Sequence, residues 1–381
     1  MKGMSLLGSP ILIVRLILVL VVASSLTLTG VFLPLRALEF GASKSLIALL
    51  MTSFSISMLS SPLWGTLSDR LGRAWFIVAG SFLLMSANVG IYLARGMVPL
   101  LALRALQGLA MALFTPSMIA LMSEGAPSGR RGVHVSAYSA LQSAGWALGS
   151  IGAGLLASRY GLDASFIAGA LIAGLGGILS ISAFLDRERR VLLPTPRKGE
   201  RFLSLYIASF LRDSSILGAY SLLAIYLKEL RWDEGLMGVF FSINMITQVP
   251  LMFCAGLLTA RIGYIPVTMA GMVGSGVVLL GYAAGRGVEL LLVQPLMAFS
   301  YACFFVGTRG LASEKAGIEV GRTLGVFSLC RNVGGIVGPI IAGILVENLG
   351  FRRAFALLSV LPLVASLMVL VGARESSRKD I

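Results

Sequence analysis

The stretch Gly65-Thr-Leu-Ser-Asp69-Arg70-Leu-Gly72-Arg73 joins two apolar runs that are each long enough to cross a membrane. It places two glycines, one aspartate and two arginines within nine residues. A solvated turn between two membrane helices needs charge, but it needs no particular order of residues. The order found here therefore indicates a loop with a defined structure.

The chain as a whole is strongly apolar. Of its 381 residues, 57% are hydrophobic and 13% are charged, whereas a soluble domain carries about 25% charged residues. Because apolar runs occur along the full length, the composition predicts a helical protein that crosses a lipid bilayer many times. The first apolar run continues past Leu33, so we expect a retained first helix and not a cleaved signal peptide.

The net charge of +14 is explained better by a membrane than by nucleic acid, because basic residues hold loops on the cytoplasmic side. The expected loops alternate between the two sides of the membrane. The loops on one side, which include the loop assigned to Arg309, hold about twice as many lysines and arginines as the loops on the other side. Both ends of the chain fall on the more basic side, so a plasma-membrane protein with two cytoplasmic termini is predicted. The three cysteines and the single histidine lack metal-ligand spacing, and neither a cofactor nor a metal is expected.

Apolar periodicity predicts about twelve spans. The polar, basic segment 186–202 separates them into an N-terminal six-helix bundle over 1–185 and a C-terminal six-helix bundle over 203–381, with 186–202 as a cytoplasmic linker. The expected spans are 9–35, 43–64, 74–94, 97–121, 133–157 and 164–185 in the first half, and 203–227, 235–258, 265–284, 288–308, 322–346 and 352–373 in the second.

Glycines repeat between the two halves. Gly145, Gly149 and Gly154 recur 189 positions later, as Gly334, Gly338 and Gly343. The halves are therefore predicted to be parallel structural repeats.

The stretch from Gly65 to Arg73 resembles the signature loop between helices 2 and 3 of the major facilitator superfamily of secondary transporters. The resemblance implies an all-α polytopic fold with about twelve transmembrane helices in two parallel six-helix halves. It also implies that Asp69 faces the N-terminus of helix 11 in the other half, where the helix dipole favours negative charge. Arg73 would pair with an acid at the end of helix 4, for which Glu124 is the candidate.

These contacts would hold the cytoplasmic ends of the two halves together and would break when the protein opens inward. Gly65 and Gly72 are expected to allow close backbone approach and a sharp turn. Together with Arg70, all six residues form the predicted gating group.

The span 97–121 contains Arg104-Ala-Leu-Gln107-Gly108, which resembles a second motif of the superfamily, R-x-x-Q-G. Arg104 and Gln107 share a helix face because they are three residues apart. An arginine inside a span is costly unless it faces water or a partner. The resemblance associates it with proton coupling or substrate binding, and the alternative is an arginine that reaches the outer interface.

The span 133–157 contains Gly145, Gly149 and Gly154, and is similar to the G-x-x-x-G-P-x-x-G-G motif of drug:proton antiporters with twelve spans. Ser150 stands where that motif has proline, whereas the second copy has Pro339 after Gly338. Close packing of membrane helices through small residues is the better explanation for most of these glycines. The motif therefore favours export over import only modestly.

Charges inside spans mark a further candidate site. Asp213 is the carboxylate predicted to lie deepest in a helix, and a buried carboxylate is suited to carry a proton. Adjacent residues on a helix do not face each other, so Arg212 and Asp213 are expected to have different partners, with Arg331 as the partner of Asp213. Proton coupling and a structural ion pair remain alternatives here.

Several polar or aromatic side chains inside the spans are candidates to line a central cavity. Bonding between neighbouring helices is the alternative for each of them. These residues are Gln142, Trp146, Asn244, Gln248 and Gln294.

These features predict a monomeric secondary transporter that exports small amphipathic molecules in exchange for protons by alternating access. The alternative is proton-coupled uptake or exchange of a small organic anion, because Arg104, Arg212 and Arg331 outnumber the deep carboxylates and an arginine can bind a carboxylate through two bonds. A membrane enzyme is not expected, since the sequence has no nucleotide-binding loop, metal cluster or nucleophile triad.

Overall fold

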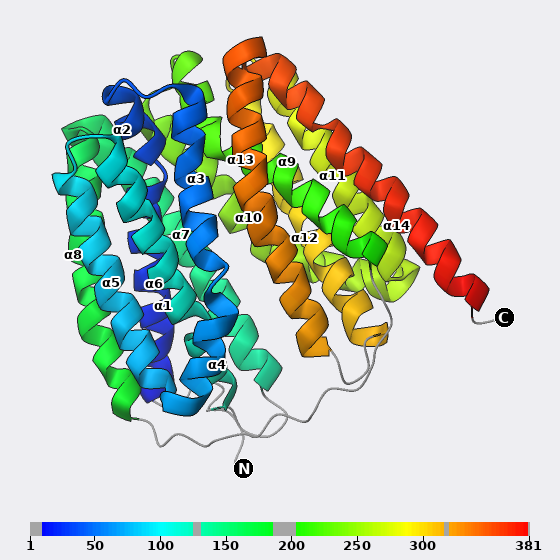
Figure 1. Cartoon of the computed structure of the whole chain (residues 1–381), viewed down its shortest axis with the longest axis horizontal. Helices are drawn as coiled ribbons and strands as arrows, with labels where there is room; N and C mark the ends of the chain where they lie inside the picture. The colour runs from blue at the N-terminus through cyan, green and yellow to red at the C-terminus, as the bar shows by residue number, and fades with distance from the viewer. Residues whose placement is uncertain (1–9, 125–130, 186–202, 316–319, 380–381) are drawn as a thin grey trace. The chain divides into compact units, whose positions relative to one another are not determined.

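The computed structural model describes residues 10–124, 131–185, 203–315 and 320–379, and these are almost entirely helical. Lipid offers no hydrogen-bond partners to the backbone, so a chain this apolar satisfies its N–H and C=O groups within helices. The elements are α1 (Pro10–Gly30), α2 (Leu33–Glu39), α3 (Lys44–Met58), α4 (Ser61–Leu71), α5 (Arg73–Leu93), α6 (Met97–Glu124), α7 (Arg131–Tyr160), α8 (Leu162–Ser180), the 3-10 helix η1 (Ile181–Leu185), α9 (Leu203–Glu229), α10 (Glu234–Ile262), α11 (Tyr264–Ala284), α12 (Leu290–Lys315), α13 (Val320–Leu358) and α14 (Val360–Lys379) (Figure 1).

Nine segments of the described residues are long and apolar enough to cross a membrane. One of them, Gly325–Leu370, contains Gly350 with φ +76°, where two helices meet at a kink. The expected spans 133–157 and 203–227 are helical as α7 and α9 but do not belong to the nine. The total of twelve spans stays a prediction.

The chain divides into two compact units. The first comprises Met1–Arg36, Ile56–Leu193 and Asp233–Ser242, and the second comprises Ala37–Ser55, Pro194–Trp232 and Ile243–Ile381. The expected linker 186–202 lies outside the described residues. The division of the chain at that linker stays a prediction.

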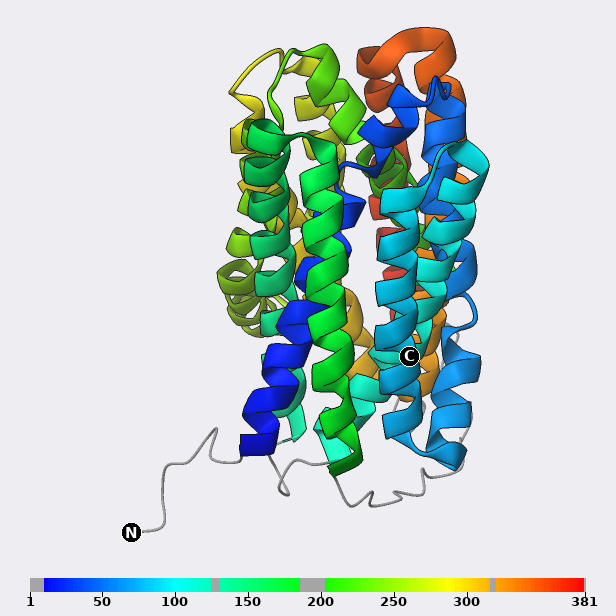
Figure 2. The same cartoon turned by 90° about the vertical axis from the view of Figure 1, so that its left-hand side faces the viewer.

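The helices of the two units pack in the same pattern. In the first, α1 packs against α7 and α8, and α5 packs against α6 and α8 (Figures 1 and 2). In the second, α9 packs against α13 and α14, and α11 packs against α12 and α14. The correspondence of α1, α5, α6, α7 and α8 with α9, α11, α12, α13 and α14 agrees with the repeat of glycines along the sequence.

Glycines allow α1 and α7 to approach each other closely. A β-carbon on Gly145 would lie 2.5 Å from the Leu20 carbonyl oxygen, and one on Gly149 would lie 2.5 Å from the Ser24 carbonyl oxygen. At both positions the backbone of α1 lies too close to leave room for a side chain. Small residues at these positions let the two backbones touch, as in other membrane helix pairs.

The corresponding contact in the second unit joins α9 and α13. A β-carbon on Gly334 would lie 2.9 Å from the Ser214 backbone nitrogen, and one on Gly338 would overlap the Ser214 carbonyl oxygen. From the other side, a β-carbon on Gly218 would lie 2.6 Å from the Gly338 carbonyl oxygen. Pro339, the next residue, is buried inside α13.

The third glycine of each set packs against a different helix. In the first unit, a β-carbon on Gly154 would lie 2.7 Å from the Glu234 carbonyl oxygen at the start of α10. In the second unit, a β-carbon on Gly343 would lie 2.8 Å from the Ser45 α-carbon at the start of α3. All six glycines therefore lie at close helix contacts.

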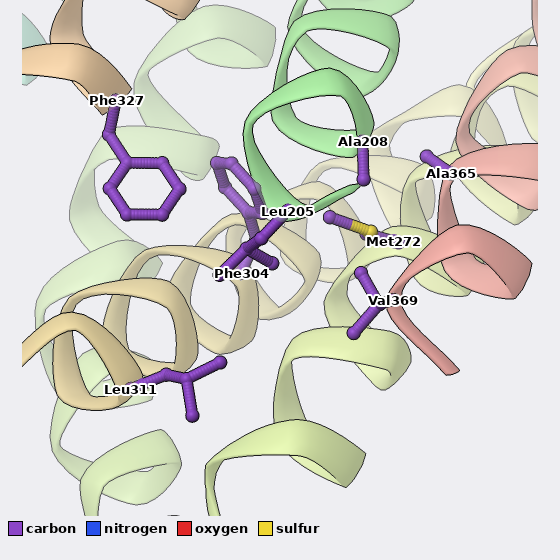
Figure 3. Close-up of a cluster of buried hydrophobic side chains, with 8 residues drawn as sticks. All are labelled: Leu205, Ala208, Met272, Phe304, Leu311, Phe327, Ala365 and Val369. Carbon is purple, nitrogen blue, oxygen red and sulfur yellow. The ribbon is translucent and has the colours of Figure 1, made fainter. Parts of the chain in front are cut away.

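A cluster of buried apolar side chains joins five helices of the second unit (Figure 3). Phe304 of α12 belongs to this cluster and also borders the charged residues described below. The members are Leu205 and Ala208 of α9, Met272 of α11, Phe304 and Leu311 of α12, Phe327 of α13, and Ala365 and Val369 of α14.

Candidate functional site

The sequence from Gly65 to Arg73 spans most of α4 and the first residue of α5. Gly72 lies between the helices with φ +105°, a conformation that favours glycine, so the expected sharp turn occurs there. The close approach expected at Gly65 is wrong. Gly65 lies inside α4, and a β-carbon there would make an ordinary contact, 3.5 Å from the Pro116 β-carbon.

Arg73 is the centre of an ionic cluster. Its guanidinium pairs with Asp69 one turn earlier and with Glu124 at the end of α6, where Nη2 lies 2.7 Å from Oε1. Nη1 also donates a hydrogen bond of 2.9 Å to Ser68 Oγ, while Arg70 is exposed. The pair with Glu124 matches the sequence-based expectation, whereas the pair with Asp69 was not anticipated. The expected position of Asp69 at a helix of the other half stays a prediction.

Arg104 belongs to a polar network in the first unit. Its Nη1 donates a hydrogen bond of 2.6 Å to Gln107 Oε1. The Gln107 amide nitrogen donates in turn to Thr29 Oγ1 at 2.9 Å and to Asn88 Oδ1 at 2.6 Å. Gln107, Thr29 and Asn88 are fully buried, so this network holds the Arg104 guanidinium in place from inside the bundle.

Asn88 connects the network to two further helices. Its amide nitrogen donates to Ser25 Oγ of α1 at 2.9 Å and to the Gly169 carbonyl of α8 at 3.2 Å. Sequence reasoning missed Ser25, Thr29 and Asn88. The available signal was a strongly polar amide in the middle of the apolar span 74–94.

Arg212 and Asp213 form a buried ion pair within α9. Arg212 Nη1 lies 2.7 Å from Asp213 Oδ1, and the two residues are 2% and 4% exposed. The expectation that these neighbours have different partners is wrong, because the long arginine side chain curls back to the adjacent carboxylate. Arg212 Nε also donates to Ser275 Oγ at 3.0 Å, and its guanidinium carbon lies 4.5 Å from the centre of the Phe304 ring.

Arg331, the expected partner of Asp213, bonds elsewhere. Its Nη1 donates a hydrogen bond of 3.2 Å to the Tyr301 hydroxyl. Within the part of the chain that the structure describes, the ion pair of Asp213 is with Arg212. The pairing of Arg331 with Asp213 is therefore wrong.

Arg309 was assigned to a cytoplasmic segment by sequence and was missed as a site residue. Helix α12 continues through it to Lys315. The Arg309 guanidinium carbon lies 3.3 Å from the centre of the Phe305 ring, and that ring is 5.4 Å from Tyr301. Arg309 thus belongs to the same group of aromatic and basic side chains as Arg331.

The amide and aromatic candidates differ in their surroundings. Gln142 and Trp146 are half-buried on one face of α7, and the Gln142 amide donates to the Tyr138 hydroxyl at 3.0 Å. Gln294 is fully buried and donates to the Tyr282 hydroxyl at 2.9 Å. A position lining an open cavity is therefore wrong for Gln294.

Asn244 and Gln248 lie one turn apart on α10. They are only 4% and 6% exposed, so neither presents much of its surface to solvent. A role in lining a cavity stays a prediction for both.

The apolar helices of the described residues, with an ion pair buried inside α9, define a multi-pass membrane protein. The model of the Major Facilitator Superfamily matches residues 15–226 and 202–381, and the chain belongs to that superfamily. Its members are transporters and not enzymes.

The comparisons identify relatives in sequence and in fold. The multidrug resistance protein MdtG of Escherichia coli O17:K52:H18 is 26% identical over 325 residues, which cover 80% of this chain and 78% of MdtG. A peptide transporter, POT, crystallised with sulfate has a TM-score of 0.82 at 14% identity, covering 98% of this chain and 96% of that one. A bacterial homologue of the human lysosomal transporter Spinster, solved in an inward-facing, unoccupied conformation, has a TM-score of 0.75 at 14% identity and covers 98% of both chains.

Proposed function

We propose that this protein exports small amphipathic molecules across the plasma membrane in exchange for protons, with both termini in the cytoplasm. The observation that carries the proposal is the buried pair of Arg212 and Asp213. Burial disfavours a charged carboxylate and an adjacent guanidinium favours it, so a transport cycle that alters the contact of Asp213 with Arg212 would let the carboxylate bind and release a proton. The similarity to the multidrug resistance protein MdtG supports export as the direction.

The cluster around Arg73 is proposed to act as a cytoplasmic latch, that is, a set of contacts that positions Asp69 to hold the cytoplasmic ends of the two halves together. Arg73 joins α4, α5 and α6 by its bonds to Asp69 and Glu124. Each such pair near the surface contributes only about 1 kcal/mol. That is small enough to break in each cycle and large enough to bias a two-state equilibrium.

The proposal is tested with purified protein in vesicles that carry an imposed pH gradient. When the lumen is acidic, exchange for protons concentrates a substrate dye inside the vesicles. When no pH gradient is imposed, adding substrate outside raises the luminal pH. A panel of cationic, neutral and acidic aromatic dyes covers the expected range. Equal dye accumulation with and without a protonophore would rule out proton coupling.

The second candidate function is uptake or exchange of a small organic anion. It is favoured by the three arginines Arg104, Arg212 and Arg331, which exceed the single buried carboxylate Asp213 in the described spans. The same vesicles separate the two functions by sign. Entry of an anion together with protons concentrates it in vesicles with an alkaline lumen and lowers the luminal pH.

We expect Asp69→Asn to slow transport roughly fivefold, the change that about 1 kcal/mol produces in a two-state population. The substitution keeps the size of the side chain and removes its charge next to Arg73. Initial rates in vesicles give the effect, and the melting temperature of the purified variant shows whether folding is intact. Glu124→Gln is expected to act in the same direction, since it removes the other charge bound to Arg73. Transport by Asp69→Asn at the parent rate would mean that the latch has no role.

A further inference from the structure

Two buried serines connect the guanidinium of Arg212 to helices α11 and α12. Arg212 Nε donates a hydrogen bond of 3.0 Å to Ser275 Oγ of α11. The Ser275 hydroxyl lies 2.7 Å from the Ser300 hydroxyl of α12. Both serines are fully buried, so bulk water does not compete for these bonds.

The direction of the bonds follows from the hydrogens that are present. The Nε–H group of Arg212 can only donate, so Ser275 Oγ accepts from it and turns its own hydrogen elsewhere. The Gly271 carbonyl, at 2.8 Å, and the Ser300 hydroxyl are acceptors for that hydrogen. Ser300 donates to the Gly271 carbonyl at 2.7 Å. Each hydroxyl hydrogen therefore has an acceptor while Ser275 holds the arginine.

The serines have little freedom to move, because α11 and α12 touch at this level. A β-carbon on Gly271 would overlap the Phe304 backbone nitrogen and would lie 2.8 Å from the Ser300 carbonyl oxygen. The Phe304 ring is buried in the apolar cluster of the second unit, and its centre lies 4.5 Å from the Arg212 guanidinium carbon. A hydrogen bond and a cation–π contact thus hold the arginine against α11 and α12.

Asp213 lies against a different helix, α13. A β-carbon on Gly334 of α13 would lie 3.3 Å from the Asp213 β-carbon. The carboxylate meets Arg212 through Nη1 at 2.7 Å, whereas Nη2 has no hydrogen-bond partner among the described residues. One such bond is weaker than the two parallel bonds that an arginine can form with a carboxylate. The strength of the pair therefore depends on where the guanidinium is held.

We propose that Ser275 is a positioning residue which, supported by Ser300, holds Arg212 where its charge stabilises the ionised carboxylate of Asp213. The inference rests on the proposed function for its part in transport, because the serine then sets the pH at which the proposed proton carrier takes up a proton. Ser275 acts on Asp213 through Arg212 and transfers no proton itself.

Other titratable or charged groups lie near Asp213, and a change at Ser275 leaves them in place. No residue of α11 or of 360–370 in α14 is charged. The contributions of the remaining groups are common to the parent protein and its variants, so a difference between them reports the contact of Ser275 with Arg212. These groups are Tyr301 and Arg309 of α12 and Cys330 and Arg331 of α13.

The test titrates Asp213 by infrared spectroscopy on the full-length protein in lipid nanodiscs. The C=O stretch of a protonated carboxyl group grows as the pH falls, and the band that is missing in Asp213→Asn belongs to Asp213. We expect Ser275→Ala to move the midpoint of this band by about one unit to higher pH, as the loss of one hydrogen bond to a charged group implies. An unchanged or lower midpoint would overturn the proposal.

Further variants separate positioning from general loosening. Ser300→Ala should cause a smaller shift in the same direction, because Ser275 still reaches the Gly271 carbonyl, and Ser275→Thr should keep the parent midpoint because it retains the hydroxyl. The matched control is Ser221→Ala, which removes a buried hydroxyl of α9 that donates within its own helix. A shift in Ser221→Ala as large as that in Ser275→Ala would contradict the assignment.

Transport assays distinguish failure of this inference from failure of the proposed function. In vesicles, the pH dependence of gradient-driven accumulation should move with the Asp213 midpoint in Ser275→Ala. If the parent accumulates substrate but the midpoint is the same in Ser275→Ala, the positioning role is wrong and proton-driven export stands. If the midpoint shifts but no tested compound responds to the gradient, the positioning role stands and the proposed function is wrong.

Discussion

Asp213→Asn will abolish proton-driven accumulation of substrate while exchange of substrate across the membrane continues. The amide keeps the shape of the side chain and still accepts a hydrogen bond from Arg212, but it does not take up a proton near neutral pH. Loss of the carboxylate also leaves the Arg212 charge buried at 2% exposure. Removing one partner of a buried ion pair costs about 3–5 kcal/mol, so the variant will also melt at a lower temperature.

Two measurements separate these effects. Accumulation in vesicles with a pH gradient reports coupling, and counterflow of labelled against unlabelled substrate reports the binding and movement that need no proton. A double variant, Arg212→Met with Asp213→Leu, should regain most of the lost stability, because apolar residues of similar size often replace a buried ion pair without loss. It should not regain accumulation. Persistence of gradient-driven accumulation in Asp213→Asn would exclude Asp213 as the proton carrier.

Gly338→Ala is expected to lower the stability of the fold through a steric clash. Its β-carbon would overlap the Ser214 carbonyl oxygen, and a backbone atom inside a helix has little freedom to move aside. The helices α9 and α13 must then separate along their contact. Overpacking of this kind usually costs about 1–3 kcal/mol and occasionally more.

The matched control lies on the same helix. A β-carbon added to Gly325 would meet no atom of the described residues within 4 Å, so Gly325→Ala keeps the packing and gains helix propensity of up to about 1 kcal/mol. Melting curves of the two purified variants provide the comparison. Equal melting temperatures would show that the contact between α9 and α13 tolerates a methyl group.

Features that depend on local sequence could be predicted well. The order of residues around Gly72 predicted a turn, and the glycine repeats predicted close contacts of α7 and α13 with other helices. The pair of Arg73 with Glu124 could also be anticipated, because the resemblance to a known loop supplied the spatial relation that sequence distance does not contain.

Features that depend on side-chain conformation and tertiary packing could not be predicted. The rule that adjacent residues on a helix diverge describes their β-carbons, and the flexible chain of Arg212 overcomes it to reach Asp213. Asn88 gains its importance only when α1, α5, α6 and α8 are packed together. Arg309 was assigned to a loop because the sequence does not show where α12 ends.

The network around Gln107 has a consequence for selectivity. Both hydrogens of its amide group are bonded inside the bundle, and its oxygen is bonded to Arg104. A solute that takes the guanidinium away from that oxygen must compensate an interaction that exists before it arrives. We therefore expect a solute whose polar groups bind the guanidinium more weakly than Gln107 does to be disfavoured at Arg104, so that the network sets a minimum strength for any polar contact made there.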